Sequence, residues 1–314
     1  MSKITKVIFD NDGVNIDSEH IAMGDMDEFG YDLVHQYIDP ETSGLKESDI
    51  YVEYKGVSSN EITKKLIEKY NLPEDAIRTD YNIPEGVDLY EFLSDLHTKS
   101  VISKFESGKL ETLPHVKETL QAMRDELGEG NMALCTTSRG DRMDATVHAI
   151  DPNTKENIGW GDTFPSDERN LRISGYKHEG EDKHPNKYIH FRELHPDWDP
   201  ETTAVVEDTA GSTKKAIDAG FTNVIGIVAS KFQTLDDEGY FSRDKQLAEI
   251  AKLKEASARV IVTDYRDIPA AIEWMDNGMS MDNVPSFHGE VHHNNPLEAD
   301  RRVTKATPGA HGPN

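Results

Sequence analysis

Residues 6–14 read KVIFDNDGV, an apolar run that ends on two aspartates and a glycine. The run predicts a buried strand, and side chains two positions apart on a strand point the same way, so Asp10 and Asp12 face one site. In α/β proteins, ligands bind at the carboxyl ends of the strands. Two neighbouring carboxylates raise each other's pKa unless a cation compensates, and Mg²⁺ takes oxygen ligands. The stretch therefore indicates a magnesium site, although an acidic turn after a strand has the same composition.

The composition limits the class of protein. The chain has 314 residues, 36% hydrophobic and 30% charged, which is enough for one large domain or two moderate ones. Its net charge of −25 disfavours acidic membrane surfaces and also nucleic acid, whose binding depends on Lys and Arg neutralising phosphates. No apolar run approaches the roughly 20 residues of a membrane span, and no secretory signal is visible. Cys135 is the single cysteine, so we expect no disulfide within the chain and a cytoplasmic protein. From the net charge we expect neither a nucleic-acid nor a membrane partner.

The chain divides into a helical block and an α/β pattern. From about 18 to 108 the sequence is polar and helical, with Ser58 and Glu61 at the spacing of a capping box, and it holds no convincing strand. Residues 151–182 read mostly as loop, and beyond about 285 all periodicity is lost, which predicts a loose tail. Apolar runs separated by helices predict strands at 5–9, 132–135, 203–206, 224–228 and 260–262. Such alternation implies a mostly parallel sheet with right-handed crossovers.

Three of these predicted strands end in polar clusters. The first ends on Asp10 and Asp12, the second runs into Thr-Thr-Ser-Arg at 136–139, and the third ends on Glu207 and Asp208. Because the carboxyl ends of parallel strands lie at one edge of a sheet, we expect the three clusters to converge. This convergence is stronger evidence for a site than any single cluster.

In this order, the clusters resemble the motifs of the haloacid dehalogenase (HAD) superfamily of phosphoryl-transfer enzymes. The matching segments are Asp10–Val14 with Asp17–Glu19, Leu134–Ser138, Lys183–Tyr188 and Val206–Gly211. The resemblance covers about residues 5–275. It implies an α/β fold whose core is a Rossmann-like doubly wound parallel sheet. This core is expected in residues 1–17 and 110–285. An all-helical cap domain of the C1 type is expected to be inserted in residues 18–109, and an irregular tail is expected in 286–314.

The resemblance also implies catalytic roles. Asp10 is expected to be the nucleophile that attacks phosphorus and forms an aspartyl-phosphate. Asp12 is expected to protonate the leaving alcohol and then to activate water. Thr136 would hold a phosphoryl oxygen, and Lys183 would balance the charge on Asp10 and the phosphate. For Thr136 and Thr137, capping of the following helix is the structural alternative.

The same resemblance implies Mg²⁺ as the cofactor. The expected ligands are the Asp10 carboxylate, the Asp12 backbone carbonyl and Asp208. Glu207 is expected to be a further ligand or a partner of one, with capping of the loop before residues 212–219 as its alternative. The candidates for binding phosphate or substrate are Thr137, Ser138, Arg139 and, in the cap, Lys55.

The position of the active-site lysine is open. The family usually shows Lys-Pro-x-Pro-Asp, whereas this chain has Lys183-His184-Pro185-Asn186, one residue short. Lys187 and Lys177 are therefore alternatives to Lys183.

Three comparisons with relatives bear on the activity. Dehalogenases proper need no acid at the second position, so Asp12 favours phosphoryl transfer. Ser59 stands where β-phosphoglucomutases have an arginine, which favours a hydrolase over a mutase. Phosphonate-cleaving relatives need a cap lysine that forms a Schiff base, and Lys55 is a candidate, although a solvated lysine is the simpler interpretation. We expect a Mg²⁺-dependent phosphatase of a small phosphorylated metabolite such as a sugar phosphate, with a phosphomutase or a catalytically silent binding protein as alternatives.

Overall fold

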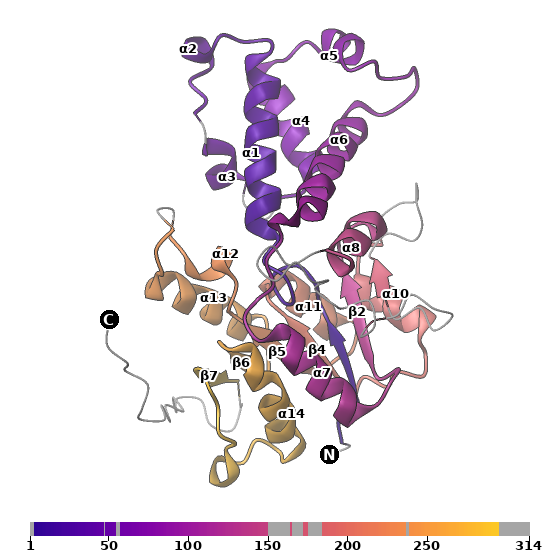
Figure 1. The fold of residues 1–314 in the computed structure, drawn as a ribbon, viewed down its shortest axis with the longest axis vertical. Helices are drawn as coiled ribbons and strands as arrows, with labels where there is room; N and C mark the ends of the chain where they lie inside the picture. Colours follow the sequence, from indigo (N-terminus) through magenta and orange to yellow (C-terminus); the bar gives the residue numbers. More distant parts are fainter. Residues whose placement is uncertain are drawn as a thin grey trace. The chain divides into compact units, whose positions relative to one another are not determined.

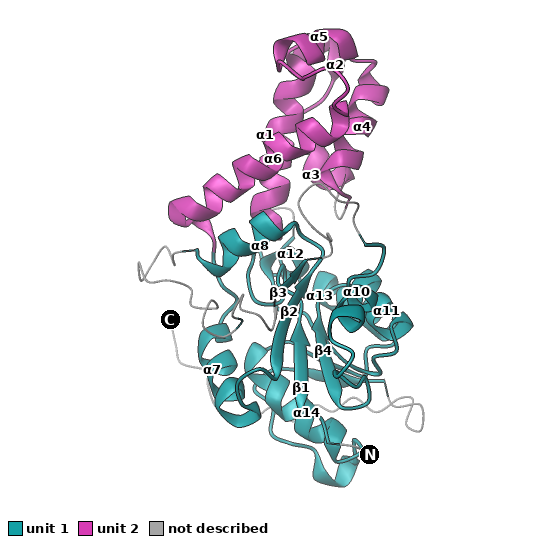
Figure 2. Ribbon diagram, turned by 90° about the vertical axis from the view of Figure 1, so that its right-hand side faces the viewer, with its two compact units in different colours: residues 1–17, 111–314 teal, residues 18–110 magenta. Residues whose placement is uncertain are grey.

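The chain forms two compact units. The computed structural model describes residues 3–46, 48–54, 57–149, 164, 172–174, 184–236 and 239–294. Unit 1 comprises Met1–Asp17 and Glu111–Asn314, and unit 2 comprises Ser18–Leu110 (Figure 2). Unit 2 is thus inserted into the sequence of unit 1 a few residues after Asp12. None of the described helices has the length and apolar character that crossing a bilayer requires.

In the described part of unit 1, seven strands form one sheet with the order β3-β2-β1-β4-β5-β6-β7 (Figure 1). All pairings are parallel except that of β6 with β7. The sheet winds outward in both directions from a central β1, as in doubly wound folds. The α/β fold class expected from the sequence is therefore confirmed. The strands are β1 (Lys6–Phe9), β2 (Met132–Thr136), β3 (Arg172–Ser174), β4 (Thr203–Glu207), β5 (Asn223–Ile227), β6 (Val260–Val262) and β7 (Val291–His293).

The sequence analysis expects neither β3 nor β7. β3 falls in the segment that reads mostly as loop, and β7 falls in residues 286–314, the expected irregular tail. That expectation is wrong for residues 291–293. Each strand has three residues, too few to display an alternating pattern, and each forms by pairing with the edge of a longer sheet, β3 with β2 and β7 with β6.

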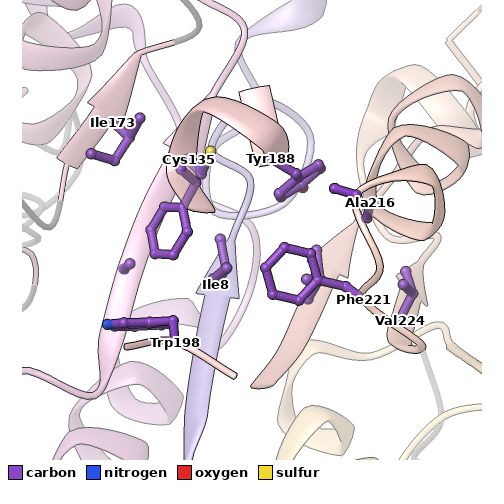
Figure 3. Packing of buried hydrophobic residues seen from close by; sticks show 12 residues of the cluster. Ile8, Cys135, Ile173, Tyr188, Trp198, Ala216, Phe221 and Val224 are labelled. Atoms are coloured by element: carbon purple, nitrogen blue, oxygen red, sulfur yellow. The ribbon is translucent and has the colours of Figure 1, made fainter. Parts of the chain in front are cut away.

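Helices cover both faces of the sheet. Ile8 and Phe9 are adjacent on β1, so they point to opposite faces. Ile8 belongs to a buried cluster with Cys135 and Tyr188 under α10 and α11 (Figure 3), whereas Phe9 stacks on Tyr265 with ring centroids 6.4 Å apart. The helices of unit 1 are α7 (Val116–Leu127), α8 (Gly140–Val147), α10 (Lys187–Leu194), α11 (Ala210–Asp218), α12 (Lys231–Thr234), α13 (Arg243–Glu255), η2 (Tyr265–Asp267), α14 (Ile268–Asp276) and η3 (Met281–Asn283).

The described residues of unit 2 form helices and no strand. α1, α4 and α6 pack on one another, and each contributes a fully buried leucine, Leu33, Leu66 and Leu93. The helices of unit 2 are α1 (Glu19–His35), α2 (Pro40–Ser43), α3 (Asp49–Glu53), α4 (Ser59–Tyr70), α5 (Glu74–Asp80), α6 (Leu89–Lys104) and the π-helical turn η1 (Phe105–Lys109).

A buried polar cluster joins α1 to α6 inside unit 2. Asp25 of α1 is 3% exposed. Its Oδ1 lies 2.6 Å from Lys104 Nζ and accepts a hydrogen bond of 2.9 Å from Ser100 Oγ. Its Oδ2 lies 3.6 Å from His97 Nε2. We call these four residues the Asp25 cluster.

Candidate active site

The turn after β1 is folded by its own backbone. The Asp10 N–H donates to the Val206 carbonyl at 3.0 Å and so extends the pairing with β4 by one bond. The Asn11 carbonyl then accepts the N–H groups of residues 14–16 at 2.9–3.3 Å. Three donors on one carbonyl close the turn tightly. As a result, Asp10 and Asp12 are held at the carboxyl end of the central strand.

Gly13 brings this turn against the end of β4. Its φ of +79° lies in the left-handed region that favours glycine. A Cβ at this position would lie 2.1 Å from Asp208 Oδ2, far inside contact distance. Only a residue without a side chain therefore lets the Asp208 carboxylate approach the turn this closely.

Three carboxylates meet at this edge of the sheet. Asp10, Glu207 and Asp208 each offer an oxygen, and these oxygens all lie within 4.8 Å of one another. The three residues are buried, with exposures of 6%, 0% and 5%. Asp10 and Glu207 follow Ile8 and Val205 by two positions, so the strand alternation places both on the face covered by α10. We call Asp10, Glu207 and Asp208 the acidic triad.

Lys187 lies in the first turn of α10, the helix that covers this face, and its side chain contacts two members of the triad. Its Nζ lies 2.8 Å from Asp10 Oδ1 and 2.8 Å from Glu207 Oε1, and the side chain is completely buried. Asn186 begins the helix by accepting the N–H groups of residues 188 and 189. A cation is unfavourable at a helix N-terminus, and burial also opposes the charge. The two carboxylates outweigh these effects, and the net result is a raised pKa of Lys187.

Glu207 is held by a second residue of α10. The Tyr188 hydroxyl donates a hydrogen bond to Glu207 Oε1. Burial, with the charge of Glu207 beside it, raises the pKa of Tyr188 well above its usual range, so it stays a donor. Among the described residues, Glu207 Oε2 is buried and has no hydrogen-bond partner. An unpartnered buried carboxylate oxygen beside two further carboxylates is the arrangement that a cation satisfies.

Asp12 lies outside the triad and has its own partners. Its Oδ2 accepts hydrogen bonds from Ser138 Oγ at 2.7 Å and Thr136 Oγ1 at 3.3 Å. Its Oδ1 lies 3.0 Å from Arg142 Nη2 of α8. Thr136 and Ser138 come from the end of β2 and the loop after it. The end of β2 thus orients the second aspartate of the turn.

The neighbouring charges and the burial of the site change the acidity of Asp10. Burial raises the pKa of Asp10 to about 8; the Glu207 charge adds to this effect, Lys187 opposes it, and Asp12 adds a smaller increase. Among the described residues, Lys187 pairs with Asp10 and Glu207, and Arg142 pairs with Asp12. The oxygen-only donor set suits a hard cation.

Most of the residues expected from the sequence lie together. Asp10, Asp12, Thr136, Ser138, Glu207 and Asp208 meet at the carboxyl edge of β1, β2 and β4. Arg139 pairs with Asp141 at 2.9 Å, and Thr137 is half-buried in the loop after β2. Outside the described residues lie Lys183, Lys177 and Lys55.

Helix capping does not account for the polar residues at the strand ends. The residue that caps α11 is Thr209, whose side chain accepts the Ser212 N–H at 3.3 Å. Glu207 is therefore not the cap. α8 begins after Arg139 without a side-chain capping bond, and the Thr136 hydroxyl instead accepts the Ser138 N–H at 3.0 Å.

Sequence reasoning missed Arg142 and Tyr188. Tyr188 is named there only as the end of the matching segment Lys183–Tyr188, without a role, and Arg142 is not considered. The available signal is position: each lies in the first turn of a helix that follows a strand end, where a long side chain reaches back over the sheet edge.

Comparisons with known proteins support the fold. No protein-family model matches the sequence, and a search of curated proteins finds no match either. Solved structures do match. A phosphonoacetaldehyde hydrolase-like protein from Oleispira antarctica has a TM-score of 0.57 at 14% identity, over 90% of this chain and 96% of that one. A conserved haloacid dehalogenase-like protein of unknown function from Agrobacterium tumefaciens has a TM-score of 0.53 at 20% identity, over 87% and 99%.

A third match is a HAD family hydrolase from Deinococcus radiodurans, whose structure holds phosphate and sodium. It has a TM-score of 0.50 at 16% identity, over 88% of this chain and 98% of that one. At these identities the likeness is one of fold. The chain therefore shares the α/β fold of these solved structures.

Proposed function

We propose that this protein is a Mg²⁺-dependent phosphatase of small phosphate monoesters, acting through an aspartyl-phosphate on Asp10. The proposal rests chiefly on the convergence of Asp10, Glu207 and Asp208 at one edge of the sheet, with Lys187 paired to two of them and Asp12 beside them. The fold it shares with a HAD family hydrolase and with a haloacid dehalogenase-like protein, and the order of its motifs, support the same chemistry. The substrate is a phosphorylated metabolite.

Asp10 is the proposed nucleophile. Its Oδ1 accepts the Asn11 N–H at 2.8 Å and pairs with Lys187, which leaves Oδ2 to attack phosphorus. A bond forms between Oδ2 and phosphorus while the bond from phosphorus to the alcohol oxygen breaks. Lys187 is the proposed active-site lysine, because it balances the charge that passes from the carboxylate to the phosphoryl group.

Asp12 is the proposed acid and base. It gives its proton to the departing alcohol oxygen, and it then takes a proton from the water that attacks the aspartyl-phosphate and releases phosphate. Ser138 and Arg142 hold its carboxylate in place for both steps. Thr136 is the proposed contact to a phosphoryl oxygen.

The acidic triad would hold the Mg²⁺, with Glu207 Oε2 as a ready ligand oxygen. When bound, the cation supplies positive charge that stabilises the phosphoryl group during transfer. Tyr188 and Lys187 both contact the other carboxylate oxygen of Glu207, Oε1, and so fix the orientation of this side chain.

The test is phosphate release from a panel of phosphomonoesters, with and without Mg²⁺, for the wild type and Asp10→Asn. We expect Mg²⁺-dependent release that falls by at least about 10⁴-fold in the variant, because Asn cannot form the acyl phosphate. Thermal unfolding in EDTA serves as the control, since the variant must remain folded.

Two outcomes would contradict the proposal. Near-normal turnover by Asp10→Asn would remove Asp10 as nucleophile. Activity that depends on a bisphosphorylated sugar and releases little free phosphate would identify a mutase.

A further inference from the structure

One side chain of the short helix α12, that of Gln233, contacts the backbone of Asp208, a member of the acidic triad. Gln233 is 4% exposed, and its side-chain Nε2 donates to the Asp208 carbonyl at 2.8 Å and to the Ile227 carbonyl at 3.2 Å. Neither contact belongs to the catalytic roles assigned above.

These two carbonyls lie where β4 and β5 separate. The last registered pair between these strands is Glu207 with Gly226, so Asp208 and Ile227 are the next residues along each strand. Among the described residues, no backbone hydrogen bond joins the two strands beyond this pair. The amide of Gln233 ties the two strand ends together instead.

The orientation of this amide follows from its partners. Its Oε1 accepts the N–H groups of Ala229 and Ser230 at 3.1 and 3.3 Å and the Ser230 hydroxyl at 3.1 Å. Backbone N–H groups only donate and carbonyls only accept, so oxygen and nitrogen cannot be exchanged without loss of four bonds. Ser230 Oγ in turn accepts the Gln233 N–H, which completes a capping box. The side chain is therefore fixed at both of its polar atoms.

Asp208 is consequently held from two sides. Its carboxylate packs against Gly13, and its backbone carbonyl is bound by Gln233. We propose that Gln233 is a positioning residue for the acidic triad, which fixes the backbone of Asp208 and thereby aims its carboxylate at the cation. This inference rests on the proposed function, because it assigns Gln233 to the same cation site.

The test measures Mn²⁺ affinity directly, by the electron paramagnetic resonance signal of free Mn²⁺, in place of Mg²⁺. Gln233→Met keeps the length of the side chain and removes all its hydrogen bonds. We expect its Mn²⁺ dissociation constant to rise about 10–100-fold, the effect typical of losing a partner of a metal ligand. Gln233→Asn keeps the amide but shortens its reach, and it is expected to weaken binding in the same way; it carries the test if Gln233→Met does not fold.

Thr234→Val is the matched control. Thr234 is a buried neighbour in α12, and its hydroxyl donates to the Ser230 carbonyl at 2.8 Å without reaching Asp208. We expect its Mn²⁺ affinity to stay within about two-fold of the wild type. Folded Gln233 variants that bind Mn²⁺ like the wild type would overturn the inference.

Asp208→Asn separates this inference from the proposed function. If Mn²⁺ binds the wild type no more tightly than it binds Asp208→Asn, the triad is not the cation site. The proposed function then fails, and the role of Gln233 fails with it. If Asp208→Asn loses Mn²⁺ and the Gln233 variants do not, the role of Gln233 alone fails.

Discussion

Each unit buries an aspartate against a lysine, and the two pairs differ in the charges around them. In unit 2, Asp25 meets Lys104 at 2.6 Å, with Ser100 as a further donor. In unit 1, Asp10 meets Lys187 at 2.8 Å, but Glu207 and Asp208 crowd the same space. In unit 2, Lys104 also lies 2.7 Å from the exposed Glu28, whereas in unit 1 Lys187 lies between the buried carboxylates of Asp10 and Glu207.

The comparison shows how a buried ion pair that joins two helices differs from a cluster of carboxylates that could bind a cation. Buried ionic groups are tolerated when their charges and hydrogen bonds are matched. In the Asp25 cluster, Lys104 and Ser100 bind Oδ1 of Asp25 and so join α6 to α1, while Oδ2 lies 3.6 Å from His97 and has no hydrogen-bond partner among the described residues. The acidic triad places three buried carboxylates within 4.8 Å of one another, and Glu207 Oε2 has no hydrogen-bond partner among the described residues. Three carboxylates this close raise one another's pKa, which a bound cation would relieve.

The largest expected difference between the clusters comes from removing each lysine. Lys187→Met leaves Asp10 and Glu207 facing each other in a fully buried site, and we expect a loss of about 3–5 kcal/mol in the free energy of unfolding. Lys104→Met leaves Asp25 with Ser100 and with water access, since the Lys104 side chain is 26% exposed, and we expect about 1 kcal/mol. Urea unfolding in EDTA measures both. Equal losses would break the comparison.

Alanine substitutions at two glycines distinguish the cost of backbone strain from the cost of crowding at the triad. Gly13 and Gly44 both have positive φ, +79° and +65°, and a Cβ on Gly44 meets nothing within 4 Å. Gly44→Ala should cost about 1–2 kcal/mol from strain alone. Gly13→Ala should cost a further 1–3 kcal/mol or so from overpacking against Asp208, and it should abolish stabilisation by Mg²⁺. Thermal unfolding with and without Mg²⁺ checks both variants; a retained Mg²⁺ response in Gly13→Ala would contradict the triad geometry.

Removing one aspartate from each cluster should change stability in opposite directions. In the metal-free protein, Asp25→Asn leaves Lys104 without its buried partner and should cost about 2 kcal/mol. Asp208→Asn relieves repulsion among the carboxylates and should add about 1 kcal/mol, while Mg²⁺ no longer stabilises the protein. Chemical unfolding curves in EDTA and in Mg²⁺ measure the sign of the change in unfolding free energy for each variant. A destabilised Asp208→Asn in EDTA would show that the triad is matched without a cation.

The smallest expected effect is a pH dependence specific to the triad. The pKa of Asp10 is raised in the folded, metal-free protein to about 8 from an ordinary value of 3.8, so between these pH values the folded state holds more protons than the unfolded state. Stability from this group is full below pH 4 and is lost as the pH rises towards 8. Between pH 6 and 7, wild type in EDTA should lose about 1 kcal/mol relative to Asp10→Asn.

Saturating Mg²⁺ is the control for this pH dependence. The cation favours the ionised carboxylate, so it should remove the loss seen in EDTA. Parallel pH profiles of wild type and Asp10→Asn in EDTA would count against an ionisation of Asp10 in this range.

The strand ends were predictable from the sequence because their geometry is local. Period-two alternation places Asp10 on the face of Ile8, and parallel pairing brings Glu207 to the same edge. The fold class follows from the same alternation of strands and helices. The short strands β3 and β7 were not predictable, since three residues have no period of their own.

The cations of the site depend on information that is not local. The choice of Lys187 depends on where α10 begins, and the Asn186 cap decides that position. Arg142 reaches Asp12 from α8, the helix after the second polar cluster, whose residues beyond Arg139 the sequence analysis does not consider. Both side chains are long, so sequence spacing alone does not say where their charges lie. The catalytic roles of these residues stay predictions until the variants are measured.

The central place of β1 in the sheet has a consequence for synthesis. Val7, Ile8 and Phe9 are completely buried, yet β1 pairs with β2 and β4, which begin at residues 132 and 203. At ~5–20 residues per second, about 10–40 s pass before β4 leaves the ribosome. During that interval the whole of unit 2 has emerged, while the strand that carries Asp10 still lacks one of its neighbours. The nascent chain therefore exposes the apolar side chains of β1 until both of its neighbours have emerged, and chaperones that bind extended apolar segments can bind there during that time.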